Sequence, residues 1–194
     1  MRLIINLALV ALVALLLYAL YDSIREPIAF KDVKETREQI VQEKLTKIRV
    51  AQEAYRDITG VFAPSFDSLA LVLNTANFTI INVNGDPDDP NFTGQVTYET
   101  ILRPAKDSML TKLGIKDFAT LAMVPFGNGA KFEMEAMEIE YQGTKVPVVQ
   151  VGTPYATFMG DFASIKFAKY DQKYDPSNPL KFGNLNSPNL AGNW

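Results

Sequence analysis

Carboxylate and amide side chains gather in one short stretch of the chain, where their spacing could hold a metal ion. The segment 86–91 supplies the oxygen ligands Asp86, Asp88, Asp89 and Asn91. Calcium prefers oxygen-rich turns, but the segment lacks the full glycine and glutamate spacing of an EF-hand loop. Aspartate, asparagine and proline are also ordinary turn residues. We therefore predict a plain turn, with an extracytoplasmic calcium- or ligand-binding module as the alternative.

A second group of carboxylates alternates with apolar residues. This acidic stripe consists of Glu133, Glu135, Glu138 and Glu140. Two carboxylates held about 5–9.5 Å apart can hydrolyse a glycosidic bond, so a carboxylate-based hydrolase is a second alternative. The alternation itself predicts a β-hairpin whose wet face is acidic. Its phase slips by one residue between Ala136 and Met137, which predicts a β-bulge.

Composition excludes several other kinds of chemistry. The chain of 194 residues contains no cysteine and no histidine. Thiol nucleophiles, thiolate zinc sites, iron–sulfur clusters and His-dependent hydrolases are therefore excluded. The net charge of −3 supplies no basic field for nucleic acid. We predict no cofactor, no nucleic-acid partner and no enzymatic activity.

The N-terminal segment is the most informative part of the chain. Residues from Leu3 to Leu20 are apolar apart from Asn6 and carry no charge. As a helix they span roughly 27 Å, close to the hydrocarbon thickness of a bilayer. Tyr18 and Tyr21 stand at the end of this run, where aromatic side chains favour the membrane interface. The pattern predicts a single-pass anchor in membrane lipid.

The residues that flank the anchor indicate whether the anchor is cleaved off and on which side of the membrane the body lies. No small-x-small cleavage site follows the apolar run, so we predict an anchor that is retained. Arg2 precedes the run, whereas Arg25, Lys31, Lys34 and Arg37 follow it. That Lys/Arg count alone places the body in the cytoplasm. The very short N-terminus is instead typical of a signal anchor, and on this ground we expect an extracytoplasmic body.

A second helix is expected from Asp32 to about Ile58, because Pro27 is predicted to end or kink the first one. Its apolar stripe consists of Val41, Leu45, Ile48, Tyr55 and Ile58, with helical spacing. The stripe fits two arrangements. It could cover the sheet of its own domain, which is our prediction, or it could form a packing seam between copies.

The remaining pattern predicts an α+β fold in which this helix packs on a mainly antiparallel sheet. Short helices are expected at 65–73 and 107–113, and strands at 78–83, 95–102, 132–141 and 145–151. The predicted organisation is a transmembrane anchor at 1–21, a juxtamembrane connector at 22–31 and a soluble domain at 32–170. Residues 171–194 are rich in Asn, Pro, Gly and Ser, which predicts an extended segment packed on the domain.

Three short segments in the first part of the chain form a pattern, namely Ile48-Arg-Val-Ala-Gln-Glu-Ala-Tyr55, Thr59-Gly60-Val-Phe-Ala63 and Phe66-Asp-Ser-Leu69. With the apolar helix before them, these segments resemble the type IV pilins and the pseudopilins of type II secretion. The resemblance covers residues 1–73. The basic leader ending in Gly and the Glu at the fifth mature position of pilins are absent here. The resemblance implies an anchored subunit that packs by its helix and displays a β-rich head.

These observations lead to one expectation about function. We expect a membrane-anchored envelope protein with a structural or protein-interaction role that is not catalytic. Its expected partners are membrane lipid and other proteins, including further copies of itself in a pilin-like assembly.

Overall fold

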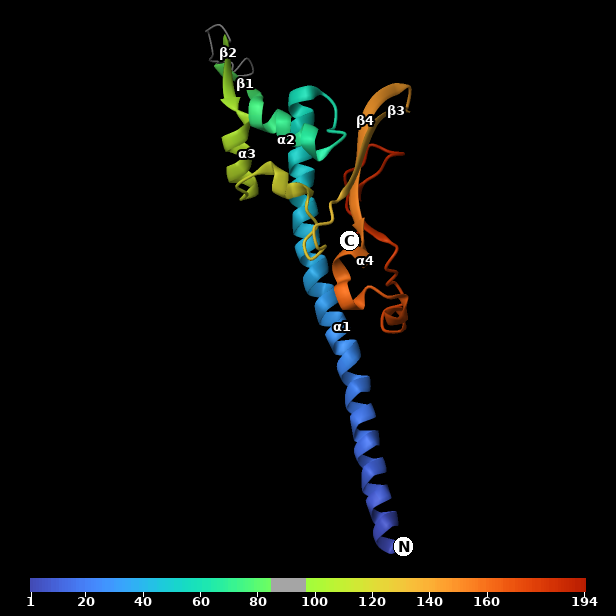
Figure 1. Ribbon diagram of the computed structural model, residues 1–194. Helices are drawn as coiled ribbons and strands as arrows, with labels where there is room; N and C mark the ends of the chain where they lie inside the picture. Colours follow the sequence, from blue (N-terminus) through green and yellow to red (C-terminus); the bar gives the residue numbers. More distant parts are fainter. Residues whose placement is uncertain (85–96) are drawn as a thin grey trace, which may run out of the picture.

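The computed structural model describes residues 1–84 and 97–194, and it shows an α+β protein built along one helix. Helix α1 runs from Arg2 to Thr59, roughly 87 Å at 1.5 Å per residue. Its N-terminal half projects alone, and its C-terminal half forms the centre of the body (Figure 1). The helix ends at Gly60, whose φ of 84° permits the left-handed cap in which its N–H donates to the Arg56 carbonyl.

Pro27 is predicted to end or kink the helix, and the first of these two alternatives is wrong. Pro27 lies inside α1, and residues 22–31 are helical throughout rather than forming a separate connector. A proline at this place removes one backbone hydrogen bond, at a cost of about 3 kcal/mol. Glu26 and Phe30, which flank Pro27 on one face of the helix, both contact the body. These contacts hold the helical path on either side of the proline.

One side of the C-terminal half of α1 carries small helices and a two-stranded sheet. Helix α2 (Phe66–Thr75) begins at Ser65, whose hydroxyl accepts from the Ser68 N–H. Strands β1 (Asn77–Asn84) and β2 (Thr97–Pro104) form an antiparallel hairpin. Helix α3 (Ala105–Leu113) and the 3-10 helix η1 (Phe118–Ala122) complete this side. Asp107 lies in the first turn of α3 and is not its cap, because Pro104 occupies that position.

The other side of α1 carries an antiparallel sheet of order β3-β4-β5 (Figure 1). Its strands are β3 (Glu133–Tyr141), β4 (Thr144–Pro154) and β5 (Pro179–Gly183). Gln142 and Gly143 connect β3 to β4, both with positive φ, as a tight two-residue hairpin turn requires. The segment 171–194 was expected to be extended without a strand. It contains β5, which pairs with β4 from Pro179 to Gly183.

The predicted bulge in β3 is absent, and with it the single acidic face. The pairing of β3 with β4 keeps one register from Glu133 to Tyr141. Side chains alternate strictly in such a strand, so Glu133 and Glu135 lie on one face and Glu138 and Glu140 on the other. The phase change instead leaves Met137 exposed near the end of the hairpin, at 43%. This part of the hairpin extends past the core, where neither face must be apolar.

The core lies around the C-terminal half of α1. Val41, Leu45 and Ile48 are fully buried, Tyr55 is 8% exposed, and Ile58 packs partly buried against the same core. Gln52 is a buried polar residue of this face. Its side chain accepts from the Ala63 N–H at 2.9 Å and donates to the Ala63 carbonyl at 3.1 Å. The apolar stripe of α1 therefore covers the body of its own chain.

Candidate membrane anchor and its surroundings

The N-terminal half of α1 exposes its apolar side chains on all sides. Leu3 is 81% exposed and Leu20 58% exposed, and Tyr18 and Tyr21 are exposed at 72% and 61%. Among the described residues, α1 is the one helix long and apolar enough to cross a membrane. Burial of a large apolar side chain is favourable by roughly 1.5–3 kcal/mol. This half of the helix therefore requires an apolar environment that the body does not supply.

The body first contacts α1 soon after the apolar run ends, along one face of the helix. Residues 155–174, here called the collar, comprise α4 (Tyr155–Met159) and the 3-10 helices η2 (Gly160–Phe162) and η3 (Ile165–Lys169). Phe30 of α1 is fully buried in it. Its ring stacks on Phe167 with centroids 5.5 Å apart and meets Tyr174 edge-on at 5.0 Å. Aromatic pairs of this kind add about 0.5–1.5 kcal/mol beyond their area.

Charged groups join the same helix face to the collar. Glu26 accepts hydrogen bonds from the Tyr170 hydroxyl and from the Lys169 ammonium, the latter at 3.1 Å. These bonds, led by that of Tyr170, lower the pKa of the Glu26 carboxyl. One helical turn past Phe30, Lys34 donates to Asp171 at 2.9 Å. The collar is thus fixed to α1 by polar contacts on both sides of the aromatic cluster.

The Lys34–Asp171 pair shifts the pKa of both partners. The hydrogen bond from Lys34 is the main cause that lowers the pKa of the Asp171 carboxyl, and the Lys173 backbone N–H adds to it. Burial alone lowers the pKa of Lys34, but its bond to Asp171 and the nearby charge of Glu38 outweigh burial and raise it. Both side chains are mostly covered, with 20% and 30% of their surface exposed.

The helix face opposite the collar continues the apolar surface past the anchor. Tyr21, Ile24 and Ile28 fall within about 60° of one another around the helix. They line a shallow hollow of about 450 Å³, and Ile24 and Ile28 are 55% and 63% exposed. This outer stripe, defined by these three residues, is separate from the buried stripe of α1. A packing seam between copies would therefore lie on the outer stripe and not at Val41 to Ile58.

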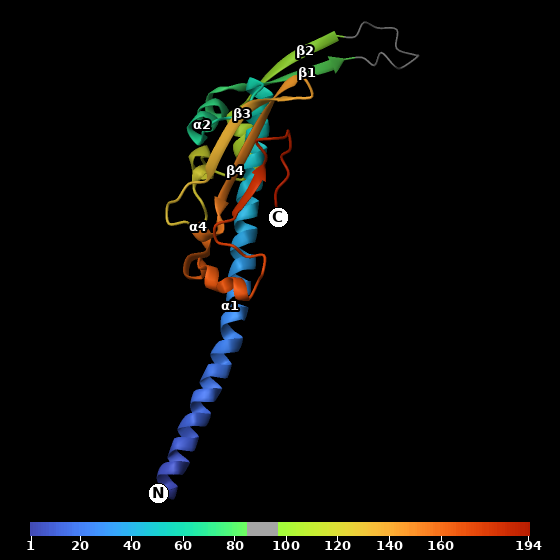
Figure 2. The same ribbon diagram turned by 90° about the vertical axis from the view of Figure 1, so that its right-hand side faces the viewer.

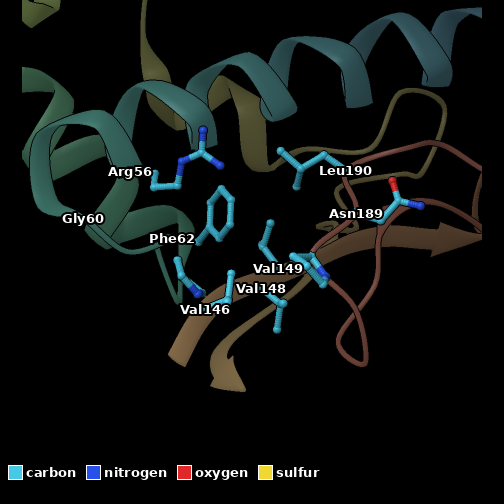
Figure 3. A pocket seen from close by; sticks show the side chains of 10 residues that line it. Arg56, Gly60, Phe62, Val146, Val148, Val149, Asn189 and Leu190 are labelled. Atoms are coloured by element: carbon cyan, nitrogen blue, oxygen red, sulfur yellow. The ribbon is translucent and has the colours of Figure 1, made fainter. Parts of the chain in front are cut away.

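An apolar groove of about 600 Å³ lies between the end of α1 and the unpaired edge of β4 (Figure 3). Phe62, Val148 and Leu190 contribute to its walls. Arg56 stands over the Phe62 ring, 5.1 Å from its centroid. None of the described residues that line the groove is a carboxylate, so the groove itself brings together no acid–base pair.

The structure does not gather the glutamates of the hairpin into a deep site. Glu133 and Glu135 line a hollow of about 170 Å³ beside Lys181, below the roughly 300–1,000 Å³ of ligand pockets. Glu138 and Glu140 are exposed on the other face of β3. The candidate calcium ligands Asp86, Asp88, Asp89 and Asn91 lie outside the described residues. Among residues 1–84 and 97–194, no three acidic side chains cluster as metal ligands.

The collar was missed at the level of sequence, although its residues carried a signal. Phe158, Phe162, Phe167, Tyr170 and Tyr174 supply an aromatic residue every three to five positions. Glu26, Phe30, Lys34 and Arg37 repeat at helical spacing and so share one face of α1. Because Pro27 was predicted to end the helix, that face was not recognised as continuous.

Searches of protein-family models, of curated proteins and of solved structures find no match to this chain. The fold and the site alone therefore define its class. It is an α+β protein with antiparallel sheets, built on a long N-terminal helix whose first part is apolar and exposed.

Proposed function

We propose that this protein is a single-pass, membrane-anchored envelope protein with a structural or interaction role that is not catalytic, and that it works as a subunit of a pilin-like assembly. The observation that carries the proposal is the division of α1. One uninterrupted helix is exposed and apolar in its first part and forms the core of the body in its last part. Such a helix joins a lipid-embedded segment rigidly to a folded head.

The proposed orientation places the body outside the cytoplasm. The layout of a signal anchor, in which an apolar run is followed by the body that it exports, supports this orientation, and the Lys/Arg residues that follow the run argue for the reverse. Lipid covers the anchor in the single subunit, and copies of the same chain meet along the outer stripe. The resemblance of residues 1–73 to pilins supports the assembly role.

Cysteine crosslinking in native membranes tests the proposal, because the chain has no cysteine of its own. Ile28→Cys lies on the outer stripe, and Glu35→Cys is a matched control two turns farther along the same exposed helix face. We expect self-crosslinks with Ile28→Cys and at most a minor fraction with Glu35→Cys. The protein should stay in the membrane fraction after extraction with alkaline carbonate. Its intact mass should be that of the 21.6 kDa chain.

Two results would contradict different parts of the proposal. A mature mass that lacks about the first twenty residues would show a cleaved signal sequence and remove the anchor. A full-length membrane protein that crosslinks only to an unrelated chain would leave the anchor in place and remove the pilin-like assembly.

A further inference from the structure

Strand β2 presents an unpaired edge at the end of the molecule farthest from the apolar part of α1. Among the described residues β2 pairs with β1 alone, and every residue of β2 is exposed. Figure 2 shows β2 on the side of the hairpin that faces away from the N-terminal half of α1. A free edge of this kind presents N–H and C=O groups on which another strand can pair.

The register of the hairpin identifies the backbone groups at this edge. At the base of the hairpin, the Ala105 N–H donates to the Ala76 carbonyl at 3.0 Å. Bonded and non-bonded pairs alternate along an antiparallel ladder, so Ile101 and its partner Ile80 form a bonded pair within the hairpin. The residues whose backbone groups face the open edge are then Tyr98, Thr100 and Leu102.

The charges of β2 make its edge complementary to itself. Glu99 and Arg103 are the charged residues of β2, they share one face, and they stand equally far from Ile101. In an antiparallel pair of β2 strands with a two-fold axis at Ile101, Glu99 of each copy faces Arg103 of the other. Thr100 then faces Leu102, and these are the residues with free backbone groups. Pairing centred one residue away in either direction separates the charges.

Within the described residues neither Glu99 nor Arg103 takes part in an ion pair. Opposite charges directly across an antiparallel pair are favourable. Pairing of two copies would therefore supply each side chain with a partner that residues 1–84 and 97–194 of the single chain do not offer.

Other free edges lack this combination of features. The described side chains of β1 carry no charge that would select one register. The unpaired part of β4 contains Pro147, which has no N–H to donate and is typical of protected edges. Pro104 also faces the open edge, but only at the last position of β2, where it lies opposite Tyr98 of the other copy and can accept a hydrogen bond without donating one.

We infer that β2 is a homotypic docking edge whose partner is the β2 strand of a second copy of this chain. The product is a four-stranded sheet, which relieves the marginal stability of an isolated two-stranded hairpin. The hairpin lies at the end of the molecule opposite the N-terminus (Figure 2). A two-fold axis perpendicular to the plane of the hairpin would therefore make the apolar helices of the two copies point in opposite directions. The inference goes beyond the proposed function, because this interface is distinct from the outer stripe and joins two copies whose anchors point in opposite directions.

Disulfide trapping of the full chain in detergent tests this interface. At the two-fold axis Ile101 faces its own copy as a non-bonded pair, with Cα atoms about 4.5 Å apart, a separation that a disulfide can bridge. We expect Ile101→Cys to give a covalent dimer under mild oxidation. The control Ile80→Cys lies on the same hairpin face but on the other strand, and it should remain monomeric.

Charge reversal supplies the decisive comparison. Glu99→Arg in the Ile101→Cys background places like charges opposite each other, and it should lower the rate of dimer trapping by roughly fivefold or more. Adding Arg103→Glu restores opposite charges and should restore trapping. The inference would be overturned if Ile101→Cys gave no covalent dimer. It would also be overturned if neither charge change altered the rate of dimer trapping. Carbonate-resistant membrane association and crosslinking at Ile28 report separately on the proposed function.

Discussion

At the scale of single residues, the collar shows how a few side chains determine where the free helix begins. Phe30 is the first residue of α1 that is fully buried. Glu26 and Lys34 lie one turn before it and one turn after it, and both bind the collar. The aromatic cluster buries the Phe30 ring completely, and the polar contacts of Glu26 and Lys34 join the collar to the helix on either side of it.

The Lys34–Asp171 pair predicts a defined pH dependence of stability. The pKa of Asp171 is lowered below its ordinary value of 3.8, so its contribution is present above that pH and is lost as pH falls. The pKa of Lys34 is raised above 10.5, so its contribution is complete below that pH and is lost as pH rises further. The pair therefore stabilises the fold from about pH 4 to about pH 10.

We expect Asp171→Asn to lower the free energy of unfolding by roughly 0.5–1 kcal/mol at pH 7. Urea unfolding at pH 7 and at pH 3 measures the effect, and the difference from wild type should shrink at the lower pH. The control Asp161→Asn removes an exposed carboxylate of the same collar and should have little effect at either pH. A difference for Asp171→Asn that is equal at both values would contradict the assigned cause.

At the scale of elements, two glycines with positive φ differ in how much space surrounds them. Gly143 in the β3–β4 turn has a φ of +78° and open space around it. Gly183 at the end of β5 has a φ of +80°, but a Cβ there would lie 2.0 Å from the Val149 carbonyl oxygen. The second glycine is required both by its backbone conformation and by the close approach of β4.

Alanine at these two positions separates the two requirements. Gly143→Ala should cost about 1–2 kcal/mol, the usual penalty for an L-residue in the left-handed region. Gly183→Ala should cost at least about 3 kcal/mol, because the clash with β4 adds to that penalty. Urea unfolding of both variants measures the difference. Equal costs would mean that β5 can move away from β4 without loss of stability.

Local signals in the sequence predicted the short elements well. The helix predicted at 65–73 and the strands predicted at 132–141 and 145–151 are found as α2, β3 and β4, because capping and turn chemistry act over a few residues. The path of α1 through Pro27 could not be predicted in this way, since collar residues more than 120 positions away hold it. For the same reason β5 was missed, because its pairing with β4 joins segments that are distant in the sequence.

Local patterns were also insufficient for the candidate sites. The four glutamates of β3 suggested one acidic face, but the register with β4 divides them between two faces. The long apolar run was visible directly, because a membrane segment needs only length and composition. The outer stripe could not be identified from the sequence, because it is defined by the helix face that the collar leaves uncovered. Which face the collar covers depends on tertiary packing.

At the scale of the whole molecule, the chain divides at the collar into a part with its own core and a part without one. Every residue before Glu26 is exposed, and the core cluster begins at Phe30. The body therefore takes its stability from residues after that point, and the first part of α1 is the part that we propose attaches the protein to the membrane. This division makes separate predictions for folding and for membrane association.

Deletion of residues 2–20 should leave the free energy of unfolding of the body unchanged within about 0.5 kcal/mol, because it removes no buried side chain. The same deletion should release the protein from the membrane fraction. Deletion of residues 2–36 is the matched comparison, since it also removes Glu26, Phe30 and Lys34, and loss of the buried Phe30 ring alone should cost about 3–5 kcal/mol. Thermal unfolding and carbonate fractionation measure the two effects. If the shorter deletion unfolds the body, the apolar half of α1 has a structural role that its exposure does not show. If the protein that lacks residues 2–20 still sediments with membranes, the body itself attaches to them.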